Sequence, residues 1–201
     1  MNFHILFFIL MSNLVCSRSS SSTTSYQYKP IFRPNLPAGP FKMKIKAYMP
    51  CDIKFDHLIN FNIYLSKTSL TRFEIMGNLT FLIPFDDSLT INLNYAVKGS
   101  NGGWIKNSHL MTIKNACNSL KSHLGNRWLN YTKAFNFKGT DCPISPGVYV
   151  SSGIDQSIFE NCDVQSFFFY GEYKVTLTFN NSSGVLVGCS ESLQDIVRPW
   201  E

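Results

Sequence analysis

Apolar and polar residues alternate with a period of two in three stretches that lie far apart in the chain, residues 41–47, 90–97 and 173–179. Successive side chains of a β-strand point to opposite faces, so this period predicts strands with one buried and one solvated face. The third stretch is followed by a turn sequence rich in Asn, Ser and Gly at 180–184 and by a second apolar run at 185–189. These three segments together predict an antiparallel hairpin.

One segment departs from this period and predicts a helix. Its apolar residues recur at spacings of four, three and four, which places them on one helical face: Ile113, Cys117, Leu120 and Leu124. Asn107 or Ser108 is the candidate cap at its start, and Gly125 stands where such a helix would end. The expected fold is therefore mainly β, an antiparallel β sandwich or β-cup crossed by one short helix.

The N-terminus predicts secretion. Residues 5–11 are apolar but too few to span a bilayer, and the polar residues that follow favour a signal peptide over residues 1–17, cut after Ser17. Residues 18–40 are rich in Ser and Pro and predict a disordered lead-in, so the folded domain is expected over residues 41–201. No later apolar run has the roughly 18 residues of a membrane-spanning helix.

The cysteines and the glycosylation acceptors agree with an oxidising compartment. Removal of the signal peptide would take away Cys16 and leave Cys51, Cys117, Cys142, Cys162 and Cys189. No Cys-x-x-Cys pair is present, which favours disulfides over a zinc site, and the odd number leaves one thiol free or paired with another chain. Asn-x-Ser/Thr acceptors occur at Asn78, Asn130, Asn180 and the overlapping Asn181. The expected location is extracellular, with the lysosomal lumen as the alternative.

No catalytic or metal-binding motif is recognisable. A nucleophile elbow, a zinc-protease motif and a phosphate-binding glycine loop are all missing from the sequence. His57, His109 and His123 have no metal-ligand spacing, and the pair Asp86-Asp87 is typical of a polar turn. The sequence therefore predicts no enzyme, no metal and no cofactor.

Charge is distributed unevenly along the chain. The nine basic and two acidic residues of segment 18–72 give a net charge of +7, and segment 73–201 has a net charge of −2. Lys42, Lys44 and Lys46 share one strand face, and this row either contacts anionic membrane surfaces transiently or is simply a solvated face. The second interpretation is favoured. A nucleic-acid partner is not expected, because basic and aromatic residues do not interleave.

Three stretches in the second half of the chain carry a family resemblance. Residues 115–120 surround Cys117, residues 141–149 contain a Cys-Pro-x-x-x-Gly-x-Tyr pattern, and residues 170–189 contain a Gly-x-Tyr strand and a closing Gly-Cys hairpin. In order and spacing these resemble the ganglioside-activator branch of the ML lipid-recognition superfamily, over roughly residues 105–192. The chain departs from that branch by lacking its additional cysteines near the helix.

The resemblance implies a β-cup around an apolar cavity, without catalytic residues, in a secreted protein that carries or presents a lipid or other hydrophobic small molecule. It also implies the disulfides Cys51–Cys189 and Cys117–Cys142, with Cys162 unpaired, and a partner enzyme or receptor as a further expectation.

The aromatic residues are abundant enough to fill a core or to line such a cavity, since the chain has 17 Phe and only 15% charged residues. The pattern alone favours a filled core. For the cavity, inward strand positions supply the candidate lining residues: Met43, Ile45, Phe81, Ile91, Leu93, Phe167, Phe169, Val175, Leu177 and Phe179. Trp104 and Trp128 are the candidates for its rim, because an indole suits a boundary between apolar and wet surroundings.

Two other functions stay open at this point. A secreted interaction glycoprotein would have a filled core and would act through an apolar surface patch on a protein partner. A hydrolase with an unrecognised site would have a titratable group with a shifted pKa in a cleft.

Overall fold

The computed structural model describes residues 36–51, 57–70, 72–159 and 167–201. The expected signal peptide, most of the expected lead-in and Cys162 lie outside the described residues. No helix in the described ranges has the length and apolar character needed to cross a membrane.

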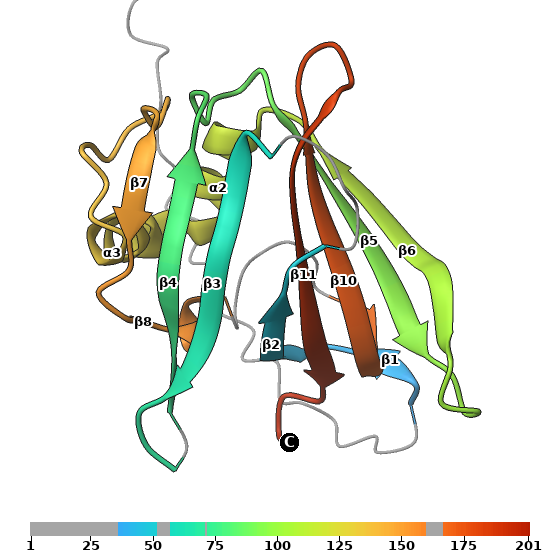
Figure 1. The fold of residues 1–201 in the computed structure, drawn as a ribbon. Coiled ribbons are helices and arrows are strands. Elements are labelled where there is room, and N and C mark those ends of the chain that lie inside the picture. Colours follow the sequence, from blue (N-terminus) through green and yellow to red (C-terminus); the bar gives the residue numbers. More distant parts are fainter. Residues whose placement is uncertain (1–35, 52–56, 71, 160–166) are drawn as a thin grey trace, which may run out of the picture. The chain divides into compact units, whose positions relative to one another are not determined.

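Nine of the strands in the described chain form one sheet (Figure 1). Its strands are β2 (Lys42–Met49), β3 (Ile59–Lys67), β4 (Phe73–Phe81), β5 (Thr90–Lys98), β6 (Trp104–Ile113), β7 (Gly147–Val150), β8 (Ile154–Asp155), β10 (Gly171–Asn180) and β11 (Leu186–Val197). The spatial order is β6-β5-β10-β11-β3-β4-β7, with β2 also paired to β11 and β8 to β4. A separate two-stranded sheet joins β1 (Ala38–Gly39) to β9 (Phe168–Phe169).

The mainly β, mostly antiparallel class and the β10–β11 hairpin are confirmed. The strands expected in two sandwiched layers, however, belong to one continuous sheet. One part of the sheet contains β6, β5, β10, β11 and β2, and the other contains β3, β4, β7 and β8. The two parts are joined by a short parallel contact in which Gly188 and Cys189 of β11 pair with Ile59 and Asn60 of β3. A Cβ atom at Gly188 would lie 2.8 Å from the Cβ of Ile59, so glycine is required where the two strands approach.

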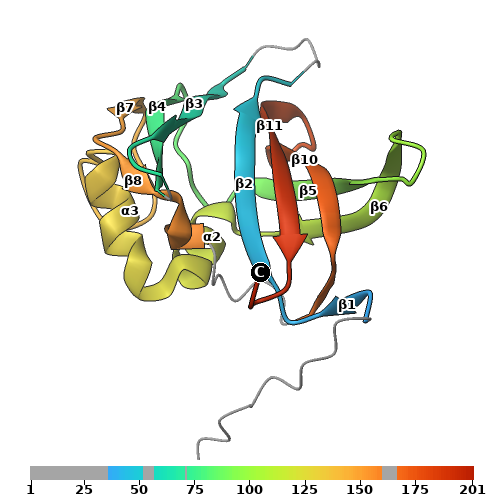
Figure 2. The ribbon, with the colours of Figure 1, turned by 90° about the horizontal axis from the view of Figure 1, so that it is seen from below.

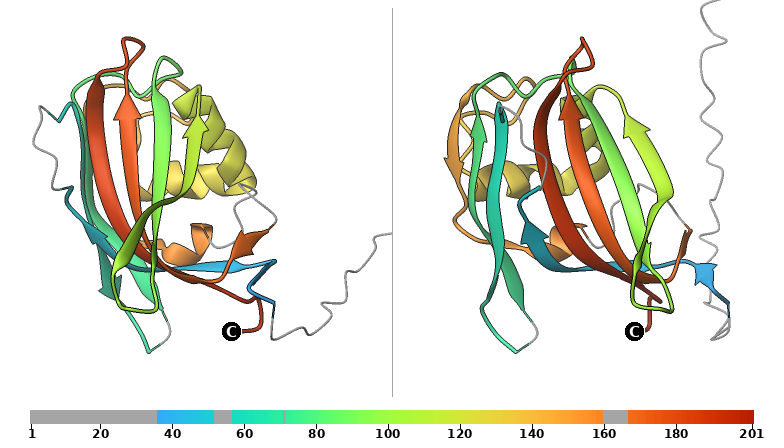
Figure 3. Two further views of the ribbon diagram at one scale, coloured as in Figure 1. Left: turned by 90° about the vertical axis from the view of Figure 1, so that its right-hand side faces the viewer. Right: turned by 45° about the vertical axis from the view of Figure 1, so that its right-hand side comes forward.

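The single helix is longer than expected and begins later. Residues 116–134 form a 19-residue helical segment, made of α2 (Ala116–Leu124), the 3₁₀ turn η1 (Gly125–Arg127) and α3 (Trp128–Ala134). Gly125 does end α2, with φ of 52°, but the chain continues into η1 and α3 instead of leaving the helix. Figure 2 and Figure 3 show the segment lying against one face of the sheet.

The expected helix start was wrong because strand pairing extends further than the turn signals indicated. Asn107, Ser108 and Ile113 all belong to β6, where Ile113 pairs with Ile91 of β5. The residue before α2 is Asn115, in the left-handed conformation with φ of 55°, and its side chain makes no capping hydrogen bond. The helix therefore takes its cap from elsewhere.

That cap comes from the expected polar turn before β5. Asp86 accepts hydrogen bonds from the backbone N–H and the hydroxyl of Ser88, which closes the turn. Asp87 then accepts the backbone N–H of Asn118, in the first turn of α2, and a second hydrogen bond from the Asn118 side-chain amide. These hydrogen bonds hold the pKa of Asp87 below its usual value.

Replacing Asp87 by alanine is expected to lower the free energy of unfolding by about 1 kcal/mol at pH 7, because a helix N-terminus loses its acceptor. A carboxylate with a lowered folded pKa stabilises fully above its unfolded pKa of about 3.9, and the contribution is lost as pH falls through the folded pKa. The free energies of unfolding of the wild type and of Asp87→Ala, measured with urea, should therefore converge at acid pH. Asp87→Asn keeps an acceptor oxygen and should lose less stability; an alanine variant as stable as the wild type at pH 7 would contradict this role.

Two of the three lysines in the row on β2 have polar partners within the protein. Lys46 Nζ lies 2.8 Å from Glu172 and 3.3 Å from Asp195, and Glu172 also pairs with Lys98 at 2.7 Å. Lys44 Nζ donates to the backbone oxygen of Glu201. These contacts favour a solvated strand face over a positively charged membrane-binding surface.

The two disulfides implied by the resemblance are confirmed. Cys51–Cys189 ties the chain just after β2 to β11, and Cys117–Cys142 ties α2 to the segment before β7. The described fold also begins earlier than Phe41, because β1 at Ala38–Gly39 pairs with β9.

The glycosylation acceptors lie on different elements. Asn130 is exposed on α3, Asn78 is half-buried on β4, and Asn180 is the last residue of β10. The amide nitrogen of Asn180 donates to the backbone oxygen of Gly184, whereas Asn181 engages its carbonyl oxygen with Ser183 and Val185.

Candidate functional site

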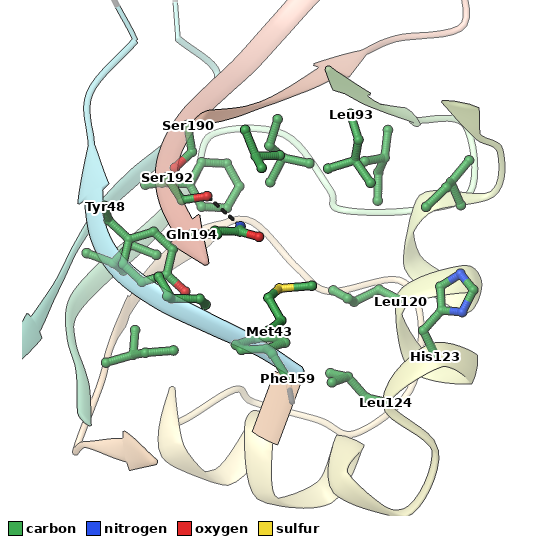
Figure 4. A pocket seen from close by; sticks show the side chains of 18 of the residues that line it. Met43, Tyr48, Leu93, Leu120, His123, Leu124, Phe159, Ser190, Ser192 and Gln194 are labelled. Carbon is green, nitrogen blue, oxygen red and sulfur yellow. Dashed lines mark hydrogen bonds between the residues drawn. The ribbon is translucent and has the colours of Figure 1, made fainter. Parts of the chain in front are cut away.

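A cavity of about 440 Å³ lies between the sheet and the helical segment (Figure 4). Its first wall is the inward face of four adjacent strands, β5, β10, β11 and β2. The strand register places their side chains in rows: Leu93 of β5 lies opposite Leu177 of β10, which lies opposite Ser190 of β11. On the other side of β11, Tyr48 of β2 lies opposite Ser192.

The facing wall comes from the helical segment and from the part of the sheet that contains β3 and β4. Helix α2 contributes Leu120, His123 and Leu124, and α3 contributes Trp128 and Tyr131. Strands β3 and β4 add further apolar residues: Phe61, Ile63, Ile75, Leu79 and Phe81. The Cys117–Cys142 disulfide fixes the helix against the segment before β7, so this wall is covalently held.

Aromatic rings pack around the cavity and do not fill it. Phe61 stacks on Phe179 with ring centroids 5.3 Å apart, and Phe81 stacks on Phe85 at 5.4 Å. Phe137 contacts Tyr149 edge to face at 4.7 Å. The structure leaves a space of about 440 Å³ beside these well-packed rings, much larger than the small voids of an ordinary protein core.

One corner of the cavity is polar. Ser190, Ser192 and Gln194 occupy alternate positions on β11, are each at least nine-tenths buried, and line the cavity. Gln194 Nε2 donates to Ser192 Oγ at 2.7 Å, and the carbonyl oxygen Gln194 Oε1 is buried without a hydrogen-bond partner. The phenol of Tyr48 lies beside them (Figure 4), and burial raises its pKa.

The cavity carries no permanent charge on its described lining. None of the residues that line it is Lys, Arg, Asp or Glu, and His123 is its single imidazole. Within the described ranges, no group of three or more His, Cys, Asp or Glu side chains is placed to hold a metal ion. The arrangement can enclose an uncharged apolar molecule and offer it a few hydrogen bonds.

The structure brings together most of the candidate lining residues. Those that line the cavity are Met43, Ile45, Phe81, Ile91, Leu93, Val175, Leu177 and Phe179. Phe167 and Phe169 do not: they are 54% and 63% exposed, and Phe168 between them is the residue that points inward. The run of three phenylalanines was assigned to the wrong face, since a shift of one residue inverts a strand.

The two tryptophans expected at the rim lie elsewhere. Trp128 is 2% exposed inside the wall, and its indole Nε1 donates to the backbone oxygen of Thr140 at 2.6 Å. Trp104 begins β6, is 36% exposed, and is not among the residues that line the cavity. Trp128 is therefore a structural part of the helical wall.

Sequence reasoning missed the polar corner and the α3 wall. The segment around Ser190, Ser192 and Gln194 is polar at almost every position, so nothing in it marks these three residues as inward. Only their register against Leu177 and Tyr48 places them in the cavity. For α3, Gly125 predicts the end of the helix, but it ends only α2 and begins η1.

The sequence matches no protein-family model and no curated protein.

Proposed function

We propose that this protein holds a lipid or another hydrophobic small molecule in the cavity and carries or presents it. The observation that carries this proposal is an apolar space of about 440 Å³ inside a chain whose surrounding rings are closely packed. Its size falls within the roughly 300–1,000 Å³ of small-molecule sites. Each CH₂ group that a ligand buried there would contribute about 0.8 kcal/mol to binding.

Further observations support the same function. The resemblance of residues 115–120, 141–149 and 170–189 to the ganglioside-activator branch of the ML superfamily implies a β-cup that encloses a lipid, and the sheet with its helical cover is compatible with that form. Two disulfides favour an oxidising compartment, so we place the carrier outside the cell or in the lysosomal lumen. A receptor or enzyme that takes over the ligand belongs to the same proposal.

The cavity favours this function over the interaction glycoprotein considered above. A protein that acts only through a surface patch does not need an apolar pocket of this volume. No catalytic step is proposed: the lining serines Ser190 and Ser192 lie on β11, and the lining imidazole of His123 lies on α2, across the cavity from them (Figure 4).

The test is mass spectrometry of an organic extract of the protein, secreted from a eukaryotic cell and purified without detergent. We expect an apolar molecule in near-stoichiometric amount, or, if the protein is purified empty, saturable binding of the fluorescent probe N-phenyl-1-naphthylamine. An empty extract together with no probe binding would overturn the carrier function and favour a protein partner.

A further inference from the structure

The polar corner is the part of the cavity that the carrier function does not explain. A wall that only desolvates an acyl chain needs no polar side chain, and burying one without a partner is unfavourable. The other two buried polar side chains of the described core are satisfied locally: Thr132 donates to the backbone oxygen of Leu129, and Ser151 donates to that of Ile75. Among the described residues, three buried side-chain oxygens have no hydrogen-bond partner, those of Asn94, Gln156 and Gln194. Of these three residues, only Gln194 lines the cavity.

The geometry around Gln194 points this oxygen into the cavity. Its amide nitrogen is held by Ser192 at 2.7 Å, which fixes the orientation of the side-chain amide. In Figure 4 the carbonyl oxygen faces the space between Met43, Leu93 and Leu120, and α2 lies on the far side. Gln194 is 8% exposed and lines the cavity.

The surroundings restrict the chemistry of a partner. The free atom Gln194 Oε1 is an acceptor, so the ligand must supply a hydrogen-bond donor. The cavity has no Lys or Arg on its described lining to neutralise a carboxylate or phosphate, and no Asp or Glu to pair with an amine. An uncharged hydroxyl group meets these conditions, and it can also accept a hydrogen bond from the phenol of Tyr48, which lies opposite Ser192 in the strand register.

We propose that Gln194, oriented by Ser192 and assisted by Tyr48, forms an internal subsite for the hydroxyl group of a neutral lipid, which therefore lies in the cavity with its hydroxyl innermost. This inference rests on the proposed carrier function and deepens it by naming the ligand class, a neutral lipid alcohol in preference to a fatty-acid anion. The raised pKa of Tyr48 keeps its phenol protonated and able to donate.

The test compares two ligands of equal chain length, 1-dodecanol and dodecanoate at pH 8, as competitors of N-phenyl-1-naphthylamine. We expect the wild type to bind the alcohol at least about tenfold more tightly, which corresponds to one well-made hydrogen bond and no buried charge. In Gln194→Leu the affinity for dodecanol should fall about tenfold. The affinity for 1,6-diphenyl-1,3,5-hexatriene, an apolar probe without a hydrogen-bond donor, should stay unchanged.

Two further readouts separate this role from a structural one. The double variant Ser192→Ala/Gln194→Leu removes both partners of the buried hydrogen bond together with the unpaired oxygen, so without ligand it should unfold at a temperature no lower than that of the wild type. Residues needed for folding would lower that temperature. The matched control is Asp195→Asn, on the same strand but facing outward toward Lys46, which should leave the preference for dodecanol intact.

The outcomes also distinguish this inference from the function on which it rests. Equal binding of dodecanol and dodecanoate, or a preference that persists in Gln194→Leu, would overturn the hydroxyl subsite and leave the carrier function standing. No binding of the probe or of either ligand by the folded wild type would overturn both.

Discussion

Removing the Cys51–Cys189 disulfide is expected to lower the free energy of unfolding by about 5 kcal/mol, the largest stability loss that we predict for this chain. The bond closes a loop of 138 residues, and a cross-link restricts the unfolded chain more strongly as its loop grows longer. A loss of this size lowers the melting temperature by about 10–20 °C in a chain of this length. The measurement is thermal and denaturant unfolding of Cys51→Ala/Cys189→Ala.

The second disulfide provides the matched comparison. Cys117–Cys142 closes a loop of 25 residues, for which the same chain-entropy model gives about 3.5 kcal/mol. The double variant Cys117→Ala/Cys142→Ala should therefore be the more stable of the two. The reverse order would show that the cross-link holding α2 against the segment before β7 stabilises the native state in a way that loop closure does not describe.

Replacing Leu177 by arginine is expected to weaken binding of N-phenyl-1-naphthylamine about 100-fold or more, which corresponds to about 3 kcal/mol. Leu177 is central to the inward face, between Leu93 of β5 and Ser190 of β11. An arginine there would bring a charge into a cavity without an acidic residue on its described lining, and its side chain would also occupy the space of the ligand.

A second variant keeps this prediction testable if the arginine prevents folding. Leu177→Trp is apolar and fills part of the cavity, so it should also abolish probe binding while the protein stays folded, at a stability cost of about 1–3 kcal/mol. The control is Lys174→Gln on the same strand, whose side chain faces outward and pairs with Glu191 at 3.2 Å. Equal loss of binding in the Lys174 and Leu177 variants, with both folded, would show that the probe does not occupy this cavity.

The local pattern of the chain was sufficient for the elements that depend on neighbours in sequence. Period-two alternation identified β2, β5 and β10, and the turn at 180–184 identified the β10–β11 hairpin, because side-chain alternation and turn geometry are properties of short segments. The two disulfides came from the family resemblance and not from the pattern, since spacing alone does not determine cysteine pairing.

The sequence pattern did not predict the features that depend on how separate strands and helices pair and pack. The phase of residues 167–169 is set by pairing with β1, which places Phe168 inside and exposes its two neighbours. The inward position of Gln194 is set by register against β2 and β10, and the continuation of the helix past Gly125 by the burial of Trp128 and Phe135.

By itself, then, the sequence determined that this chain makes mostly antiparallel strands with one apolar face each, and that it has many aromatic rings to bury. Only the tertiary structure decided that these faces enclose a space, and that one corner of that space is polar. The physical reason is that a cavity is a small difference between the volume the elements enclose and the volume their side chains fill. No local pattern contains that difference, because it depends on strand register, sheet curvature and the position of the helical segment together.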